Sequence, residues 1–318
     1  MKLYLGIDVG SISTNFVLMD NDKKVVKYLY LRTAGDPVQA VKKGLKELSK
    51  TYSDEDIVGC GATGSARKLT GVITGADLVK NEITAHGRAA VHFVPDVKTV
   101  FEIGGQDSKI IIIRDGHPVD FAMNSICAAG TGSFLDHQAE RLKIPIEKFG
   151  ELALKSKNDV NIAGRCTVFA ESDMIHKQAI GHSIEDIIKG LCNSLVRNYL
   201  NNVAKGKDIQ PPVVFQGGVS ENIGLVKAFE EALGYKIIVP QYNTVMGAFG
   251  MALLVKKLRD EGNLKKTSFR GFETAELDIK TTSFECNGCP NRCEIIEARI
   301  EGEVISRWGD RCGKWSNI

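Results

Sequence analysis

Residues Leu3–Met19, LYLGIDVGSISTNFVLM, decide the fold of this chain. A short apolar run ends at Asp8, Gly10 and several small hydroxyl residues follow, and a second apolar run leads to the polar turn at residues 20–22. Alternating apolar residues at 25–30 then predict a third strand. The pattern predicts an antiparallel unit whose first turn is rich in small residues.

The same layout recurs further along the chain. Residues Val100–Met123 contain the strand VFEIGG, a polar turn at Gln106–Ser108, the strand KIIIIR, the turn Asp115–Gly116 and the strand VDFAM. The two segments share strand, glycine-rich turn, strand, turn and strand at an offset of about 96 residues. We interpret this as an internal duplication of β-hairpin units.

Helical and strand patterns alternate around these two units. Short apolar strands are expected at 212–215 and 236–239. Apolar residues at helical spacing predict helices at 36–48, 81–91, 130–142, 168–180, 184–203, 222–233 and 244–257. This alternation favours an α/β architecture. A polar linker then leads to a small cysteine-rich hairpin at 267–318.

Composition excludes several classes of protein. The chain has 318 residues, of which 43% are hydrophobic and 25% charged, and its net charge is +2. No basic stripe is present, which argues against nucleic acid as a partner. No apolar run approaches the roughly 20 residues of a membrane span, and the N-terminus has no signal-peptide layout. We expect a cytoplasmic protein that does not bind membranes.

The glycine-rich turns predict a phosphate-binding site, because a phosphate must approach the main chain closely. Asp8 supplies a carboxylate for a hydrated Mg²⁺. Gln106 is a candidate for orienting the attacking water, whereas Lys109 on the following strand is expected to be solvated. The predicted nucleotide-binding residues are Gly10, Ser11, Ile12, Ser13, Gly104, Gly105, Gln106, Asp107, Gly217, Gly218 and Asn222.

Two cysteines are each placed at an expected helix start, where the helix dipole favours a thiolate. They are Cys127, in NSICAAGTGSFLD (124–136), and Cys166, in GRCTVFAESD (164–173). Two cysteines cannot fill the four thiolate positions of a [4Fe–4S] cluster, but a two-fold homodimer supplies the missing pair. The alternative is that both cysteines are small apolar residues buried in the core, as we expect for Cys60 and Cys192.

The order of these elements resembles the ATP-binding fold shared by actin, sugar kinases and the heat-shock chaperones, over about residues 1–257. The resemblance implies an actin-like, ribonuclease H-like α/β fold with two duplicated subdomains that bind ATP or ADP with Mg²⁺. Subdomain I is expected at 1–96 and 244–262, subdomain II with the cluster cysteines at 97–243, and the cysteine-rich extension at 267–318.

The two cysteine motifs, with GATGS (61–65), NEITAH (81–86) and EIGGQDSK (102–109), resemble the activator ATPases of 2-hydroxyacyl-CoA dehydratases and of benzoyl-CoA reductases in anaerobic metabolism. A reductase of a double-cubane cluster protein belongs to the same group. The resemblance implies a homodimer with one [4Fe–4S] cluster held by Cys127 and Cys166 of each subunit. It also implies ATP-driven delivery of a low-potential electron to an iron–sulfur partner, with ferredoxin or flavodoxin as the donor.

The last four cysteines form a separate pattern, Cys286-x₂-Cys289-x₃-Cys293-x₁₈-Cys312. Four thiolates at this spacing suit tetrahedral Zn²⁺ and equally suit a second [4Fe–4S] cluster. A segment of this size with little apolar content needs a bound metal or cluster to stabilise its fold.

Two rival functions share the same fold. A small-molecule kinase would need a carboxylate base near the reacting hydroxyl, and the chain has Cys127 at the matching place. A chaperone-like ATPase would leave the paired cysteines without a role.

Overall fold

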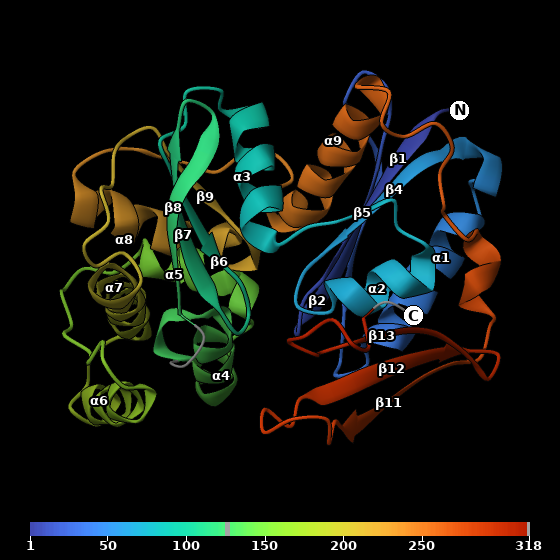
Figure 1. The fold of residues 1–318 in the computed structure, drawn as a ribbon. Coiled ribbons are helices and arrows are strands. Elements are labelled where there is room, and N and C mark those ends of the chain that lie inside the picture. Colours follow the sequence, from blue (N-terminus) through green and yellow to red (C-terminus); the bar gives the residue numbers. More distant parts are fainter. Residues whose placement is uncertain (125–127, 317–318) are drawn as a thin grey trace. The chain divides into compact units, whose positions relative to one another are not determined.

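The predicted duplication is visible as two five-stranded sheets with the same topology (Figure 1). The computed structural model describes residues 1–124 and 128–316. The sheet orders are β3-β2-β1-β4-β5 and β8-β7-β6-β9-β10. In each sheet the first three strands along the chain are antiparallel neighbours, and the fourth pairs in parallel with the first. The duplication inferred from sequence is therefore confirmed.

The chain divides into two compact units, residues 1–85 with 247–318 and residues 86–246. Unit 1 contains the first sheet, helices on both of its faces and a three-stranded C-terminal sheet. Its elements are β1 (Leu3–Val9), β2 (Ser13–Met19), β3 (Val25–Arg32), α1 (Pro37–Ser49), β4 (Ile57–Thr63), α2 (Arg67–Thr74), β5 (Leu78–Val79), α9 (Met246–Asp260), β11 (Ile279–Glu285), β12 (Glu294–Ile300) and β13 (Glu303–Trp308).

Unit 2 contains the second sheet and most of the remaining helices, and α3 (Glu82–Phe93) begins just before it. Its elements are β6 (Thr99–Ile103), β7 (Ser108–Arg114), β8 (His117–Asn124), the short 3₁₀ turn Ala128–Gly130, α4 (Gly132–Leu142), α5 (Phe149–Ala153), α6 (Thr167–Ala179), α7 (Ile184–Asn202), β9 (Val213–Gln216), the 3₁₀ turn Gly218–Glu221, α8 (Ile223–Leu233) and β10 (Ile237–Ile238).

Alternation along β1 separates two packing layers in unit 1. Leu5 and Ile7 join one hydrophobic cluster with Leu45 of α1. Gly6 points the other way, and a Cβ there would lie 1.8 Å from the carbonyl oxygen of Ala248 in α9. Only glycine allows α9 to approach the sheet this closely.

An aromatic group forms much of the core of unit 2. Phe101 of β6 and Phe215 of β9 pack with Tyr199 of α7 and Phe229 of α8, with ring centroids 5.0–5.4 Å apart. The four side chains are fully buried, which stabilises the fold by about 1.5–3 kcal/mol each. The Tyr199 hydroxyl donates to the carbonyl oxygen of Lys109, 2.7 Å away, so α7 is fixed to the strand that follows the second glycine-rich turn.

The segment after α9 is fastened to the body of unit 1. Asp77 accepts hydrogen bonds from the Thr267 hydroxyl at 2.7 Å and from Ser268 N at 2.6 Å. The Lys42 ammonium donates to the carbonyl oxygen of Leu277, and Phe272 is buried in the core shared with β1 and α1. The cysteine-rich extension therefore shares the core of unit 1.

Among the described residues, no helix combines the length and the apolar character needed to cross a lipid bilayer.

Candidate functional site

The first glycine-rich turn is held from within unit 1. Gly10 N donates to the Ser13 carbonyl oxygen at 2.9 Å. Thr33 donates through its hydroxyl to Gly10 O at 2.8 Å and through its amide to Ile12 O at 2.9 Å. These hydrogen bonds fix the backbone conformation of the predicted anion-binding turn.

Asp8 lies at the end of β1 and is 9% exposed. Its register partners are Asn15 on β2 and Thr63 on β4. Asn15 Oδ1 and Thr63 Oγ1 are buried and have no hydrogen-bond partner among the described residues. Mg²⁺ prefers oxygen ligands and keeps several waters, so this group of oxygens fits a hydrated Mg²⁺. Sequence reasoning found Asp8 and missed the other two.

Gly64, in the motif at 61–65, lies against Val9 and Asp8 at the end of β1. Its φ is +95°, and a Cβ there would lie 2.4 Å from Val9 O and 2.6 Å from Asp8 Oδ1. Ala66 N also donates to Val9 O at 3.0 Å. The start of α2 therefore packs directly against the end of β1, and only glycine fits at the junction.

The second glycine-rich turn repeats the geometry of the first in unit 2. Gly104 N donates to Asp107 O at 3.0 Å, which matches the Gly10–Ser13 bond. Gln106 is exposed, and Asp107 Oδ1 accepts from the Lys109 ammonium at 2.9 Å. The predicted water-positioning residue is therefore presented to solvent beside a fixed carboxylate.

Lys109 is buried, and the expectation that it is solvated is wrong. Its side chain is 3% exposed, and its ammonium lies 2.9 Å from Glu102 Oε2 and 2.9 Å from Asp107 Oδ1. A buried charge needs such partners because burial disfavours its ionised form. Glu102, inside the apolar strand VFEIGG, was missed by sequence reasoning.

The N-terminus of α4 is bonded to the second turn. Gly132 N donates to Gly104 O at 2.9 Å, and Ser133 N donates to Gly105 O at 2.8 Å. The Ser133 hydroxyl also donates to Gly105 O. The second turn and the N-terminus of α4 are therefore joined by hydrogen bonds from Gly132 and Ser133.

The third glycine site, at Gly217 and Gly218, has one residue with a positive φ angle. Gly217 has φ +92°, and a Cβ there would lie 2.4 Å from Ile103 O. Gly218, a predicted nucleotide-binding residue, is exposed. Asn222 caps α8, because its Oδ1 accepts from Gly224 N at 3.0 Å and Leu225 N at 3.2 Å.

A polar residue of β9 was missed by sequence reasoning. Gln216 pairs in register with Glu102 of β6. Its Nε2 lies 2.8 Å from His86 Nδ1, while its Oε1 is buried without a partner among the described residues. A glutamine within the apolar strand VVFQ was the available signal.

Cys166 is the N-cap residue of α6 and is half-buried. The loop before it is pinned to α7. The Ser194 hydroxyl donates to Ala163 O and Asn198 Nδ2 donates to Gly164 O, both at 2.5 Å. A partly exposed cysteine at a helix N-terminus is suited to act as a thiolate ligand.

Asn198 also contacts the segment that follows the first cluster cysteine. A Cβ at Gly130 would lie 2.7 Å from Asn198 Oδ1, so the backbone at Gly130 lies against this side chain. Cys127 itself lies outside the described residues. One residue of α7 therefore contacts both the loop before Cys166 and the turn at Ala128–Gly130.

Cys60 and Cys192 are fully buried, as expected for structural thiols. Burial raises the pKa of each thiol to about 12, so neither is a thiolate at neutral pH.

Within residues 1–124 and 128–316, no three His, Cys, Asp or Glu side chains converge closely enough to hold a metal. The sequence-derived metal ligands therefore stay predictions.

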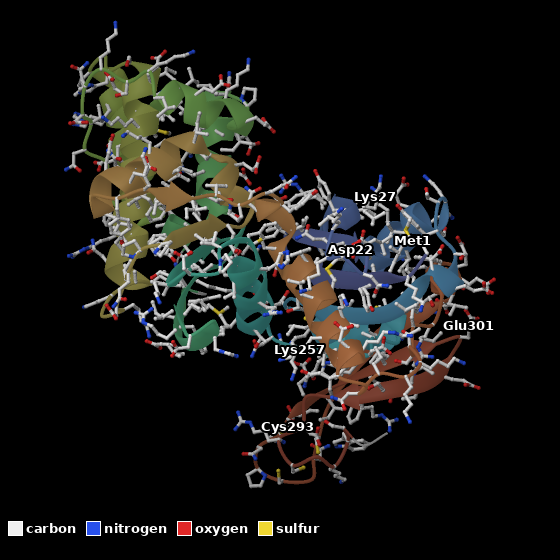
Figure 2. The ribbon with its side chains drawn as sticks, turned by 90° about the horizontal axis from the view of Figure 1, so that it is seen from above. Met1, Asp22, Lys27, Lys257, Cys293 and Glu301 are labelled. Atoms are coloured by element: carbon white, nitrogen blue, oxygen red, sulfur yellow. The ribbon has the colours of Figure 1, made fainter. Side chains whose placement is uncertain are left out.

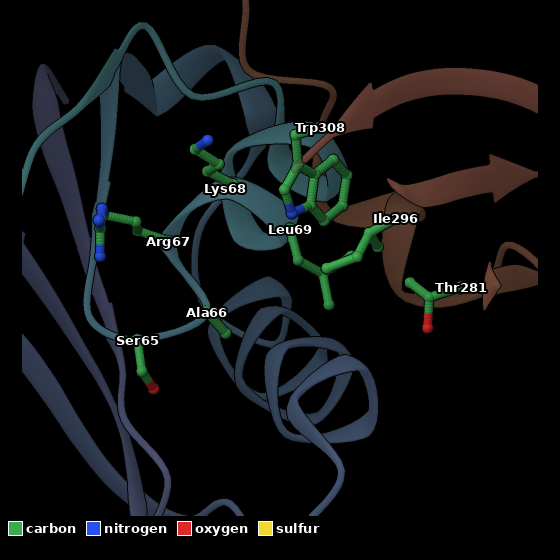
Figure 3. A pocket seen from close by; sticks show the side chains of 8 residues that line it. All are labelled: Ser65, Ala66, Arg67, Lys68, Leu69, Thr281, Ile296 and Trp308. Atoms are coloured by element: carbon green, nitrogen blue, oxygen red, sulfur yellow. The ribbon is translucent and has the colours of Figure 1, made fainter. Parts of the chain in front are cut away.

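A separate recess of about 310 Å³ lies in unit 1 (Figure 3). It is lined by the start of α2 and by the C-terminal sheet, through Ser65, Ala66, Arg67, Lys68, Leu69, Thr281, Ile296 and Trp308. None of the predicted nucleotide-binding residues lines it. The recess shows instead that the C-terminal sheet faces the helix that follows Gly64.

Comparison with known proteins places this geometry among characterised ATPases. Residues 5–255 match the model of the BadF/BadG/BcrA/BcrD ATPase family. The (R)-2-hydroxyglutaryl-CoA dehydratase activating ATPase of Acidaminococcus fermentans is 37% identical over 262 residues, which are 81% of this chain and 98% of that protein. The activator of lactoyl-CoA dehydratase of Anaerotignum propionicum is 35% identical over 253 residues, which are 78% of this chain and 95% of that protein.

Among solved structures, the activator of the 2-hydroxyisocaproyl-CoA dehydratase from Clostridium difficile with bound ADPNP superposes with a TM-score of 0.74. The two chains are 32% identical, and the match covers 82% of this chain and 96% of that one. The actin-like ATPase fold expected from sequence is confirmed.

Proposed function

Because the chain belongs to the BadF/BadG/BcrA/BcrD ATPase family, we propose that it is an activator that couples ATP hydrolysis to electron transfer. Its acceptor is an iron–sulfur enzyme, such as a 2-hydroxyacyl-CoA dehydratase, a benzoyl-CoA reductase-like enzyme or a double-cubane cluster protein. The contact of Asn198 with Gly164 and with the backbone at Gly130 supports this proposal, because both segments lie in the unit that also holds the second glycine-rich turn.

In this proposal a [4Fe–4S] cluster is held by Cys127 and Cys166 of two copies of the chain. When bound, the cluster supplies a one-electron redox centre of low potential. Cys166 is the N-cap residue of α6 and is half-buried, unlike the fully buried Cys192 of the same unit, which supports a ligand role. The electron donor is a ferredoxin or a flavodoxin.

The nucleotide is bound by the three glycine sites. Asp8, together with the buried oxygens of Asn15 and Thr63, would hold a hydrated Mg²⁺. The turns that begin at Gly10 and Gly104 hold the phosphates, and Gln106 positions the attacking water. Gly217 and Gly218 leave space for the base and sugar.

Coupling between ATP and the cysteines follows from the hydrogen bonds of α4. Release of the terminal phosphate shifts the turn at Gly104 and Gly105, and the bonds from Gly132 and Ser133 transmit that shift to α4. The residues just before α4 include Cys127. Nucleotide-linked loop changes of this kind are a common switching device.

The test is an anaerobic preparation of the full chain and of Cys127→Ser and Cys166→Ser variants. We expect a brown dimer with about two iron atoms per chain from the shared cluster. Both variants should lose the iron and the absorbance of the shared cluster while retaining binding of an ATP analogue. Cys192→Ala, which removes a buried thiol of the same unit, should stay brown. Full iron content in both cluster variants would overturn the proposal.

A further inference from the structure

The cysteine-rich segment forms one end of the sheet β11-β12-β13, beyond the region matched by the family model. Glu285 and Glu294 are the last paired residues of β11 and β12. Cys286 follows the first and Cys293 precedes the second, and Cys286 N donates to Cys293 O at 2.8 Å. Figure 2 shows Cys293 in this terminal loop. The two cysteines are therefore adjacent at the base of the loop that carries Cys289.

The fourth cysteine lies at the same end of the sheet. Trp308 closes β13 opposite Ile296 of β12, and the strands are antiparallel, so the chain beyond Trp308 runs toward the loop. Gly309 confirms this direction, because a Cβ there would lie 2.2 Å from Glu294 O. Cys312 follows three residues after Gly309. Strand register thus brings the segment of Cys312 to the end of the sheet that carries the other three cysteines.

The sulfur of Cys286 is already a hydrogen-bond acceptor. Gly288 N donates to it at 3.4 Å, and the indole Nε1 of Trp315 donates at 3.3 Å. Cys286 is 7% exposed, and the ring of Trp315 packs against Phe284 with centroids 5.1 Å apart. N–H donors aimed at a buried sulfur stabilise its anionic form and orient it, as the groups surrounding metal ligands do.

Positive charges gather around the same tryptophan. The Lys314 ammonium and the Arg307 guanidinium lie 5.4 Å and 5.3 Å from the centre of the Trp315 ring. A Cβ at Gly288 would lie 3.5 Å from the Lys314 Nζ. Arg307 is paired with Glu297 at 2.6 Å, so the Lys314 ammonium is the cation that offsets part of the repulsion among closely spaced thiolates.

The sheet itself has little hydrophobic support at this end. Every residue of β11 after Ile279 is exposed, and the buried apolar residues of β12 are Ile295, Ala298 and Ile300. Small folds with so small a core are usually stabilised by disulfides or by a metal. The four thiols are not joined in disulfides.

We propose that Cys286, Cys289, Cys293 and Cys312 bind one metal centre through four thiolates. Thiolates select Zn²⁺, Cu(I) or an iron–sulfur cluster. In the described part of the chain these side chains do not yet converge, and Cys289 and Cys312 are exposed. Metal binding draws the two exposed thiols toward the preset Cys286, because thiolate sites generally assemble as the metal binds.

The test uses the full chain carrying Cys166→Ser, so that iron of the proposed dimer cluster does not contribute. Zinc, copper, iron and acid-labile sulfide are measured per chain after anaerobic purification. We expect about one equivalent of zinc or copper, or iron with matching sulfide. Cys289→Ser and Cys312→Ser, at exposed positions, should lower that content about tenfold or more.

Asn287→Ser is the matched control, since it introduces the same side chain at an exposed position of the same loop, and should leave metal content unchanged. Removal of metal by a strong chelator should lower the Tm of the control but not that of the cysteine variants. A parent protein without bound metal, or equal content in all variants, would refute the site. The proposed ATPase function does not depend on this result.

Discussion

Asn198 of α7 donates from Nδ2 to Gly164 O at 2.5 Å, while its Oδ1 lies against Gly130. The first contact fixes the loop before Cys166, and the second supports the turn that follows Cys127. Asn198 therefore contacts a segment next to each motif that contains a predicted cluster ligand.

We expect Asn198→Ala to weaken cluster retention about 10- to 100-fold, the usual effect of losing a group that orients metal ligands. Iron content is measured during anaerobic dilution or chelator challenge, and ATP-analogue binding should change little. Asn202→Ala, at an exposed position of the same helix, is the control. Equal iron loss from both variants would remove the special role of Asn198.

Gly217→Ala should reduce both stability and nucleotide binding. Its φ of +92° and the 2.4 Å approach to Ile103 O leave no room for a Cβ. Gly206→Ala, with φ +74° and open space around it, isolates the backbone strain of about 1–3 kcal/mol. Urea unfolding should show a larger loss for Gly217→Ala, with weakened ADP binding only in that variant. Similar behaviour of the two would argue against the close approach.

Lys109→Met should destabilise the protein by about 3–5 kcal/mol, because it leaves Glu102 buried without its cation. The double variant Lys109→Met with Glu102→Gln should recover part of that loss, since the carboxylate that still lacks its cation, Asp107, is partly exposed to water. Lys189→Met, which breaks an exposed pair with Asp159, should cost at most about 1 kcal/mol. Chemical denaturation measures all three. A double variant less stable than Lys109→Met would contradict this account.

Asp186, at the start of α7, gives a pH prediction. Hydrogen bonds from Asn158, together with those from Ser156 and Lys157 N, lower the pKa of its carboxyl well below the ordinary 3.8. A lowered folded-state pKa stabilises the protein above pH 3.8, and this stabilisation is lost as pH falls below that value. Asp186→Asn should therefore lower Tm at pH 7 and flatten its dependence below pH 4. An unchanged acid profile would contradict the role of Asp186.

The sequence predicted most of the fold because the residues that cap helices and form turns lie close together in the chain. Asp36 caps α1 by accepting from Gln39 N at 2.9 Å, as its place before Pro37 indicates. The two glycine-rich turns were found because glycine and small polar residues mark tight turns wherever they occur. Strand β4 and helix α2 were not predicted, because the glycines at 59, 61 and 64 obscure the apolar pattern.

The candidate site was predicted only in part because burial depends on register. Asn15, Thr63 and Gln216 each stand in an apolar strand, and nothing local distinguishes a buried polar residue from one that faces solvent. Lys109 shows the same difficulty, since its burial follows from pairing with Glu102 across two strands. Contacts between distant segments such as Asp77 and Ser268 leave no periodic signal.

The C-terminal strands cannot be treated as a removable appendage. Phe272 and Ala275 are buried in the same core as Leu45 and Leu48, so cutting the chain near Lys265 would leave a cavity under α1, the helix that packs on Phe16 of β2. A shortened protein would lose ATPase activity because the packing under α1 is lost, even if the cysteines had no part in turnover. Point substitutions at the exposed thiols leave the packing under α1 intact. They can therefore separate a chemical role of the cysteines from a role of the whole segment in stabilising the fold.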